Sequence, residues 1–588
     1  MKPPTPQTGE DSSCSSAQAL AQVLAYHERS KHTLGRYAAG PDTLDWEAQP
    51  NPFREFSGSP HIRLPLAADQ LSASFGALHV PNSISPQPFT LESIAALLEL
   101  AFGLSAWKEY GPDRWAVRCN PSSGNLHPTE AYIVCRQITG VGDGVYHYLS
   151  RDHLLEQRCN VTAAMPESPS RLLIGLSSVI WREAWKYGER AFRYCQLDTG
   201  HAIGALRYAA ATLGWHVRIA ESFSQQQQAQ WLGLDRDADF IGAEREEAEL
   251  LLEISTGQAT DTTALADIFA PAQTHWYGQA NILDAHPMYR WPVIDEVTQA
   301  SRKVQTLPGT DRTTENLPVL KRKSESSGHD RNTTFPNPLP QSEKLLAAHT
   351  GEGVNESLRG DKSILAATLI RQRRSAQRFD AKLTQDAASF YHMLDALLPR
   401  PTAPWDVWHE AAHVHPVLFV HRVAGLEPGI YALPRNHAAQ LQMQTAMRRD
   451  FLWTKPVGCP EHLPLFLLAE TSLSKATKIM NCHQAIAGDS TFMLAMLAEF
   501  DAPLQIAPWH YRQLYWEAGL LGQVLYLQAE AAGLRGTGIG CFFDDMCHEL
   551  LGLHDKTFQS IYHFTVGFPL LDVRIASLPP YPSISSHP

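Results

Sequence analysis

The chain has 588 residues, of which 44% are hydrophobic. This length is too great for one hydrophobic core, so we expect at least two domains, and the composition excludes a chain that is disordered throughout. The formal net charge of −12 argues against nucleic acid as a partner, and no apolar run approaches the roughly 18 residues that a membrane-spanning helix needs.

The N-terminal residues 1–17 are polar and rich in proline and serine, which predicts a disordered segment without a secretory signal pattern. The nine cysteines are scattered and form no C-x-x-C motif, so we expect free thiols rather than disulfides or a zinc site. Together these features predict a cytoplasmic protein with no metal centre.

A tight polar loop is predicted at residues 120–128. Prolines bracket it, a glycine permits positive φ, and serine and asparagine side chains bond to nearby backbone, so a helix or a central strand does not fit. Such a loop presents hydroxyl, amide and N–H groups to a planar polar ligand such as a flavin ring. The alternative is the start of a helix, with Ser122 or Ser123 as N-cap. The residues assigned to the ligand are Ser122, Ser123 and Asn125.

Strands and helices are expected to alternate irregularly, which predicts an α+β fold rather than a doubly wound sheet. Apolar runs predict strands at residues 172–180 and 463–469. Motifs that end in Gly200 and Gly519 are expected to open helices, because apolar residues follow each glycine at helical spacing.

The motif around these glycines occurs twice. Residues 192–200 and 511–519 both contain an aromatic residue, an arginine, an acid, a small residue and a glycine, at an offset of 319 residues. Gly214 and Gly533, which are expected to end the two helices, keep the same offset. A run of matches in one order predicts two diverged copies of one structural unit.

The two copies predict the domain organisation. We assign the first domain to residues 18–300 and the second domain to residues 345–588. Residues 301–344 between them are polar, contain basic and proline-rich clusters, and lack apolar periodicity. We therefore expect a flexible linker there.

Two motifs of the second copy suit a phosphate-bearing ligand. Three arginines and a serine occur within residues 373–378, and guanidinium groups on one helical turn converge on a phosphate. A glycine run at residues 533–540 leaves backbone N–H groups open to close approach by a ligand. The alternatives are a solvated basic face and a bulged strand end. The residues assigned to the ligand are Arg373, Arg374, Ser375 and Arg378, together with Gly538, Ile539, Gly540 and Cys541.

These segments resemble the nitroreductase family. Pro-Ser-Ser-Gly-Asn-x-x-Pro at residues 121–128 is similar to the flavin-contacting loop, where glutamine usually occupies the place of His127. Arg-Arg-Ser-x-x-Arg-Phe at residues 373–379 is similar to the segment that grips the FMN phosphate, and residues 533–545 to the segment that passes the flavin ring. The resemblance implies two tandem nitroreductase-like α/β sandwich domains that form a pseudo-dimer within one chain.

The distribution of the motifs implies a single flavin site. The polar loop occurs only in the first copy, whereas the compact arginine motif and the glycine run occur only in the second. Residues 215–222, the first copy's counterpart of the glycine run, contain no glycine. In the family, FMN lies between two subunits. We therefore expect one composite FMN site at the interface of the two copies, and a second site that has decayed.

Residues 185–194 resemble the SagB-type branch of the family, the azoline dehydrogenases of peptide maturation. The resemblance implies that Lys186 and Tyr187 are catalytic, with the lysine charge lowering the pKa of the tyrosine hydroxyl so that it acts as a base. The alternative is an amphipathic helix in which Lys186 reaches toward solvent and Tyr187 is buried.

These resemblances imply an FMN-dependent oxidoreductase that transfers hydride between flavin N5 and a small-molecule or modified-peptide substrate, with azoline dehydrogenation as one form of the reaction. One alternative is a nitro or quinone reductase with NAD(P)H as transient reductant. Another is a non-catalytic flavin-binding or docking protein of a biosynthetic complex. The substrate, the direction of the reaction and the oligomeric state beyond the pseudo-dimer stay open.

Overall fold

The computed structural model describes residues 15–161, 170–257, 274–304, 364–408 and 410–582. Helices and strands are mixed throughout these residues, which confirms the predicted α+β class. The helices of the first half are α1 (Ser16–Arg29), α2 (Leu91–Ala101), α3 (Ile180–Tyr187), α4 (Ala191–Thr212), α5 (Gln225–Leu232) and α6 (Pro292–Ala300). The helices of the second half are α7 (Ala366–Gln372), α8 (Ala387–Asp395), α9 (His437–Ala446), α10 (Ser474–Met480), α11 (Ala485–Asp489), α12 (Asp501–Ile506), α13 (His510–Ala531) and α14 (Asp544–Leu551).

The strands divide between the halves in the same way. The first half contains β1 (Phe56–Ser57), β2 (His61–Arg63), β3 (Leu104–Tyr110), β4 (Asp113–Arg118), β5 (Thr129–Arg136), β6 (Gly144–Leu149), β7 (Leu154–Val161), β8 (Arg171–Ser178), β9 (His216–Ile219), β10 (Glu247–Ser255), β11 (Thr274–Trp276) and β12 (Gln279–Ala280). The second half contains β13 (Val414–Val420), β14 (Gly429–Ala432), β15 (Phe466–Glu470), β16 (Phe492–Glu499), β17 (Arg535–Ile539), β18 (Phe558–Gly567) and β19 (Ala576–Leu578).

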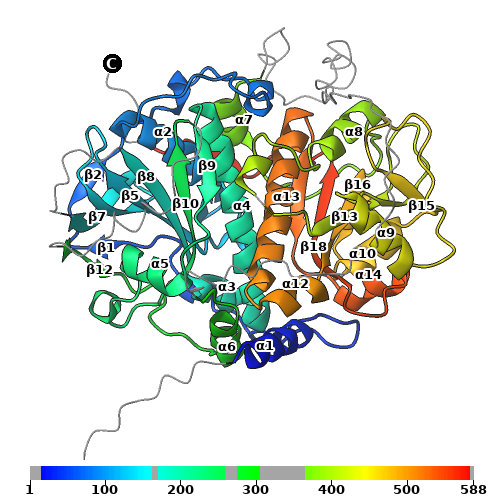
Figure 1. Cartoon of the computed structure of the whole chain (residues 1–588), viewed down its shortest axis with the longest axis horizontal. Helices are drawn as coiled ribbons and strands as arrows, with labels where there is room; N and C mark the ends of the chain where they lie inside the picture. Colours follow the sequence, from blue (N-terminus) through cyan, green and yellow to red (C-terminus); the bar gives the residue numbers. More distant parts are fainter. Residues whose placement is uncertain (1–14, 162–169, 258–273, 305–363, 409, 583–588) are drawn as a thin grey trace, which may run out of the picture.

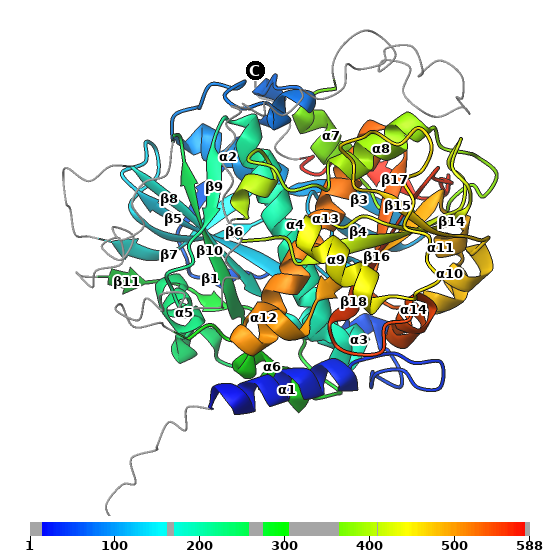
Figure 2. The same cartoon turned by 45° about the vertical axis from the view of Figure 1, so that its right-hand side comes forward.

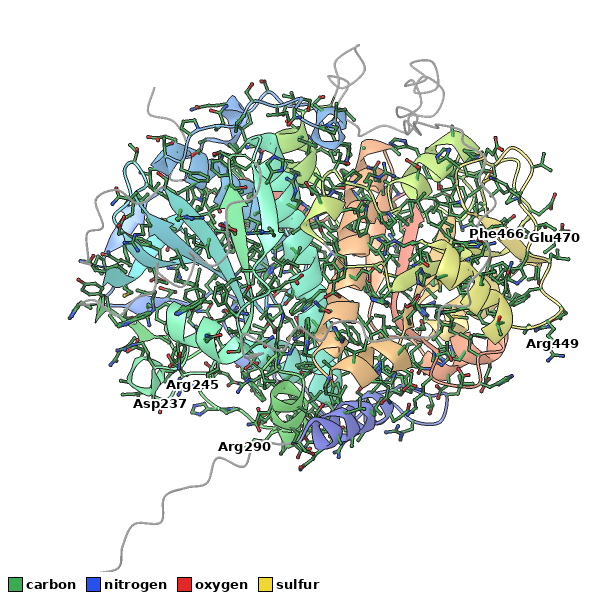
Figure 3. All side chains as sticks on the ribbon, in the orientation of Figure 1. Asp237, Arg245, Arg290, Arg449, Phe466 and Glu470 are labelled. Carbon is green, nitrogen blue, oxygen red and sulfur yellow. The ribbon has the colours of Figure 1, made fainter. Side chains whose placement is uncertain are left out.

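Each half is built around an antiparallel sheet, and the two sheets share one strand order (Figure 1). The path β7-β6-β5-β8-β10-β9 in the first half corresponds to β15-β14-β13-β16-β18-β17 in the second, and β11 extends the first path beyond β7. Strands β8 and β15 confirm the strands predicted at residues 172–180 and 463–469. The two strands differ in position, because β8 is central whereas β15 is an edge strand, with Phe466 and Glu470 at the outer margin of the molecule (Figure 3).

The long helices α4 and α13 lie side by side at the centre of the molecule (Figure 1). A Cβ atom on Gly200 would collide with the backbone of Trp516, and a Cβ atom on Gly519 would collide with the backbone of Leu197. The motifs that end in these glycines open the two helices as predicted, because α4 begins at Ala191 and α13 at His510, one residue before each motif. The glycines themselves do not begin a helix but lie nine residues inside it. The glycines instead let the two helix backbones approach each other closely.

Both long helices end as predicted. In each, the second residue beyond the end is a glycine with φ near 70°, Gly214 after α4 and Gly533 after α13. This left-handed conformation costs free energy for any residue with a side chain, so glycine is favoured there. The matching ends, the matching sheet order and the glycine contact show that the two halves have the same architecture.

Segments of each half complete the other half. The C-terminal strand β19 pairs with β3, which pairs with β4, so the end of the chain joins a three-stranded sheet of the first half. In the other direction, α1 lies along the base of the molecule (Figure 2), and its His27 is hydrogen-bonded to Tyr511 and Gln559 of the second half. One hydrophobic cluster contains buried residues of both halves, and smaller separate clusters lie beside it.

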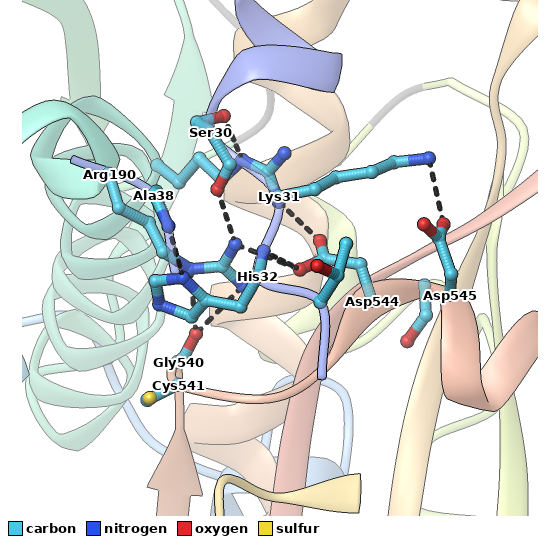
Figure 4. A network of polar contacts seen from close by, with 12 residues as sticks. Ser30, Lys31, His32, Ala38, Arg190, Gly540, Cys541, Asp544 and Asp545 are labelled. Atoms are coloured by element: carbon cyan, nitrogen blue, oxygen red, sulfur yellow. Dashed lines mark hydrogen bonds and ion pairs between the residues drawn. The ribbon is translucent and has the colours of Figure 1, made fainter. Parts of the chain in front are cut away.

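A buried charge cluster also joins the halves (Figure 4). Arg190 and Arg193, near the start of α4, form ion pairs with Asp544 of α14 at N–O distances of 3.0 and 2.7 Å. Arg190 also donates two hydrogen bonds to the backbone oxygen of Gly540. Burial by itself would raise the pKa of Asp544, but the two guanidinium charges lower it below its usual value.

Parts of two predicted segments lie outside the described residues. These are residues 1–14 of the predicted disordered N-terminus and residues 305–344 of the predicted linker. Helix α1 begins at Ser16, inside the segment predicted to be disordered. In the described part of the chain, no helix has both the length and the hydropathy to cross a membrane.

Replacing Asp544 with asparagine is expected to lower the free energy of unfolding by about 3–5 kcal/mol, because it leaves two buried guanidinium groups without a counter-charge. The matched control is Asp545→Asn, whose half-exposed carboxylate pairs with Lys31 and is expected to contribute under about 1 kcal/mol. Urea unfolding of both variants measures the difference, and equal midpoints would contradict it. Because the pKa of Asp544 is lowered in the folded state, the Asp544 carboxylate stabilises the fold fully at every pH above the usual aspartate pKa. This stabilisation is lost only in strong acid.

Candidate functional site

A cavity of about 660 Å³ lies between the two halves, and we refer to it as the interdomain cavity. Its volume falls in the range of roughly 300–1,000 Å³ that is usual for small-molecule sites. The polar and glycine residues of its wall come from both halves. Those of the first half include Lys108, Arg118, Ser122, Ser123, Gly124, Asn125, Tyr187, Tyr194 and Asp198, and those of the second half include Arg373, Arg374, Ser375, Arg535, Gly538, Gly540, Cys541 and Asp572.

The polar loop forms one wall of the interdomain cavity. It is a tight turn, with left-handed φ values of 57° at Gly124 and 59° at Asn125, and not the start of a helix that continues. A Cβ atom on Gly124 would collide with the hydroxyl of Tyr187, so only glycine fits between the loop and that ring. The Asn125 side chain donates to the backbone oxygen of Ala116, which holds the loop against β4. The predicted loop residues Ser122, Ser123 and Asn125 therefore all line the cavity.

Asp198 of α4 fixes the loop from behind, a role that the sequence did not predict. The Ser123 N–H and Oγ donate to its carboxylate at 2.9 and 3.0 Å. Asp198 is 2% exposed, and burial raises its pKa to about 8 although these hydrogen bonds act in the opposite sense. Glu183 is fully buried, and its pKa is raised well above the usual value by burial and by the charge of Asp198. Burial thus favours the protonated form of each of these two carboxyl groups.

The arginine motif forms the opposite end of the interdomain cavity. Helix α7 ends at Gln372, so the arginines do not share a helical turn as predicted; the chain turns extended at Arg373 instead. Arg373 and Arg374 both line the cavity, and within the described residues neither has an acidic partner within ion-pair distance. Burial and the charge of Arg373 lower the pKa of Arg374 to about 10. Two adjacent cations without counter-ions favour an anionic ligand.

Of the other predicted phosphate ligands, only Ser375 lines the interdomain cavity. Its hydroxyl lies 2.9 Å from that of Tyr526. Arg378 is exposed and is not part of the cavity wall, because the chain after Ser375 leads away to pair near β18. Lys108 and Arg535 take part in its place. Their role could not be read from spacing, because strand pairing brings them there: β3, which carries Lys108, pairs with β19 of the other half, and β17, which carries Arg535, pairs with β18.

The glycine run forms the third wall of the cavity. Gly538, Ile539, Gly540 and Cys541 all line it, as predicted. A Cβ atom on Gly538 would collide with the hydroxyl of Tyr562, and one on Gly540 with the ring of Tyr194, so packing from behind requires glycine at both positions. The backbone of this strand is therefore exposed to whatever occupies the cavity.

Tyr187 lines the interdomain cavity, but Lys186 does not. The Lys186 ammonium lies over the rings of Trp46 and Tyr187, 5.5 and 5.3 Å from their centroids, rather than at the tyrosine hydroxyl. The predicted lowering of the tyrosine pKa is wrong. Burial raises the pKa of Tyr187 well above 10, and the nearby carboxyl groups of Glu183 and Asp198 add to the rise. Tyr187 therefore keeps its proton at neutral pH.

The corresponding position on the other side of the α4–α13 contact is closed. There a short helix at Trp405–Val407 stands where the polar loop would be, and it packs directly on β9, the counterpart of β17. Trp405 is buried, and Arg207 of α4 holds Asp406 with two hydrogen bonds of 2.7 Å. A polar loop and a glycine-lined strand therefore face each other at the interdomain cavity and not at the corresponding position.

The charges of the cavity wall suit an anionic ligand. Five cationic side chains line it, against the carboxyl groups of Asp198 and Asp572. Two of the buried cations, Arg118 and Arg373, each have an Nε–H without a partner in the described structure. In the described residues, no group of three or more histidine, cysteine or acidic side chains is arranged to hold a metal ion.

Comparisons with known proteins agree with this architecture. The sequence pattern of the nitroreductase family matches residues 84–243. A nitroreductase-type protein of Methanocaldococcus jannaschii is 26% identical over 138 residues, which are 22% of this chain and 66% of that protein. The trifolitoxin-processing protein TfxB of Rhizobium leguminosarum bv. trifolii is 29% identical over 207 residues, which are 31% of this chain and 54% of that protein.

The structural likeness extends over almost the whole chain. A crystal structure of a nitroreductase-type protein from Anabaena variabilis covers 93% of this chain and 99% of its own length, with a TM-score of 0.60 at 21% identity. At that identity the likeness concerns the fold. This chain therefore has a nitroreductase fold throughout its two halves, and its residues 84–243 match the sequence pattern of the nitroreductase family.

Proposed function

We propose that the chain is an FMN-dependent oxidoreductase with one flavin site, the interdomain cavity. The observation that carries this proposal is the meeting of three segments in one cavity: residues 122–125 of the first half, and residues 373–375 and 538–541 of the second. They supply, in turn, hydroxyl and amide groups, paired cations, and exposed backbone. This is the donor set that an isoalloxazine ring with a phosphate tail requires.

The residues fit FMN in the following way. Arg373 and Arg374 would hold the phosphate together with Ser375, because their charges have no acidic partner in the described structure. The loop at residues 122–125 would contact the ring edge, and the backbone at Gly538 to Cys541 would run along the ring near N5. When bound, FMN supplies the hydride acceptor and donor of the reaction.

Tyr187 is the proposed proton-handling residue, and its raised pKa bears on the direction of the reaction. A hydroxyl that keeps its proton is available as a hydrogen-bond donor to a substrate that is being reduced. In a dehydrogenation the same hydroxyl would have to release that proton before it could accept another. This favours reduction of a nitro or quinone compound with NAD(P)H as the transient reductant. Lys186 lies outside the cavity wall, so it would not touch the substrate. Its effect on the reaction would come from its contact with the ring of Tyr187.

A second candidate is the dehydrogenation of a modified peptide. Its support is the similarity to TfxB, which is named for processing trifolitoxin. In that case Asp198, with a pKa of about 8, would be the nearest cavity group able to accept a proton near neutral pH. The peptide would enter from the side of Tyr187, since the cationic end of the cavity would hold the phosphate.

Substituting Arg374 with glutamine is expected to weaken FMN binding about tenfold or more, because a charge-assisted hydrogen bond contributes about 1.5–3 kcal/mol. Quenching of flavin fluorescence by the apoprotein measures the affinity. The control is Arg378→Gln, which changes an exposed arginine outside the cavity and should leave the affinity unchanged. Equal loss in both variants, or none in either, would contradict the assignment of the phosphate site.

The Tyr187→Phe variant is expected to retain FMN binding and to lose activity about 10²- to 10⁴-fold, because it removes one proton-transfer group and little volume. Anaerobic bleaching of the flavin absorbance by NADPH, followed by reoxidation with a quinone, reports the reductive direction. Asp198→Asn serves as the comparison, since it should matter more for peptide dehydrogenation than for quinone reduction. Unchanged turnover of Tyr187→Phe in both assays would remove this residue from the mechanism.

A further inference from the structure

Two cysteines meet at the wall of the interdomain cavity. The Sγ atoms of Cys482, which lies two residues beyond the end of α10, and Cys541, which directly follows Gly540, are 2.8 Å apart, within hydrogen-bond distance. They are 59 positions apart in the sequence, so the fold, rather than a local motif, brings them together. Among the cysteines that the structure describes, no other two are in such contact.

The surroundings of Cys541 favour its thiolate. The Cys482 thiol, the His32 imidazole and the Arg190 charge lower the pKa of Cys541 to about 5, and the same contact raises the pKa of Cys482. His32 Nδ1 accepts the Ala38 N–H at 2.9 Å (Figure 4). The proton of the neutral ring is therefore on Nε2, where it can be donated to the Cys541 sulfur. One sulfur is thus a nucleophile, and the other carries a proton.

Both sulfur atoms are placed for reaction. Cys482 and Cys541 are half-buried, and Cys541 lines the cavity, so a small reagent can reach it. Five of the other described cysteines are fully buried, and the remaining one, Cys459, is half-buried but has a pKa raised by burial. At Cys482 the backbone adopts a left-handed φ of 51°, followed by 62° at His483, a conformation that costs free energy for residues with side chains.

We propose that Cys482 and Cys541 are a redox-active dithiol that closes to a disulfide at the cavity wall by exchange with a low-molecular-weight disulfide. The Cys541 thiolate attacks one sulfur of the small disulfide, forms a mixed disulfide and releases one thiolate. The Cys482 sulfur then gives up its proton and attacks Sγ of Cys541, which releases the second half of the small molecule as a thiol. The protein pair loses two electrons and the small disulfide gains them. The exchange needs no flavin, so this proposal can be tested independently of the proposed function.

The first test uses the full chain, reduced, desalted and treated with oxidised glutathione before alkylation of the remaining thiols. Peptide mass spectrometry is expected to find Cys482 linked to Cys541, and dithiothreitol should reverse the link. In the Cys482→Ser variant, Cys541 should instead accumulate as a stable mixed disulfide with glutathione, because no second thiol displaces it. The Cys459→Ser variant should behave like the parent chain. Absence of the linked peptide, with equal glutathionylation of parent and Cys482→Ser, would overturn the proposal.

The second test is the rate of alkylation of Cys541 by iodoacetamide as a function of pH. We expect a midpoint well below the ordinary cysteine pKa and, at pH 6, a rate at least about ten times that of Cys459, because the thiolate is the reacting species. In Cys482→Ser the midpoint should move upward, since a serine hydroxyl is a poorer partner for the thiolate. A midpoint near the ordinary cysteine value in both proteins would overturn the assignment of Cys541 as nucleophile, whether or not FMN binds.

Discussion

The close contact between α4 and α13 is the constraint on which the rest of the structure depends. Gly200 and Gly519 each lie where a side chain would strike the backbone of the other helix, so the two helices can approach only because both positions lack a Cβ atom. The contact sets the two sheets on either side of one axis, and the buried cluster of Asp544 with Arg190 and Arg193 holds the same interface at its lower end. The contact between the two helices therefore determines where the walls of the interdomain cavity lie.

The two halves share an architecture but have diverged in chemistry. On one side of the helix contact, a polar loop faces a strand with two glycines, and the space between them is open. On the other side, a tryptophan-bearing segment packs on β9, which has no glycine, and the space is filled. Charge is also distributed unevenly in the open cavity, with Arg373 and Arg374 at one end and the Asp198 carboxyl, whose pKa is raised by burial, near Tyr187. A ligand would therefore bind in one orientation.

Local chemistry in the sequence predicted the shape of several segments of this site, and the resemblance to the nitroreductase family predicted that they share one ligand. The loop at residues 122–125 and the glycines at 538 and 540 were recognisable because tight turns and close approach demand particular residues at particular spacings. Effects that arise only in the folded state were either not predicted or predicted wrongly. The pKa of Tyr187 follows its burial rather than the neighbouring lysine, Arg378 lies outside the cavity because α7 ends before the arginine motif, and the meeting of Cys482 with Cys541 depends on tertiary packing.

The central claim is that two unlike halves build one flavin site. The most direct measurement is the flavin content of the purified chain after saturation with FMN and removal of the excess, obtained from the absorbance of the released flavin and the protein concentration. The account predicts one FMN per chain, released by substitutions in the arginine motif or in the polar loop, although the two segments lie in different halves. Two tightly bound FMN molecules per chain, or a site that survives loss of either segment, would contradict it.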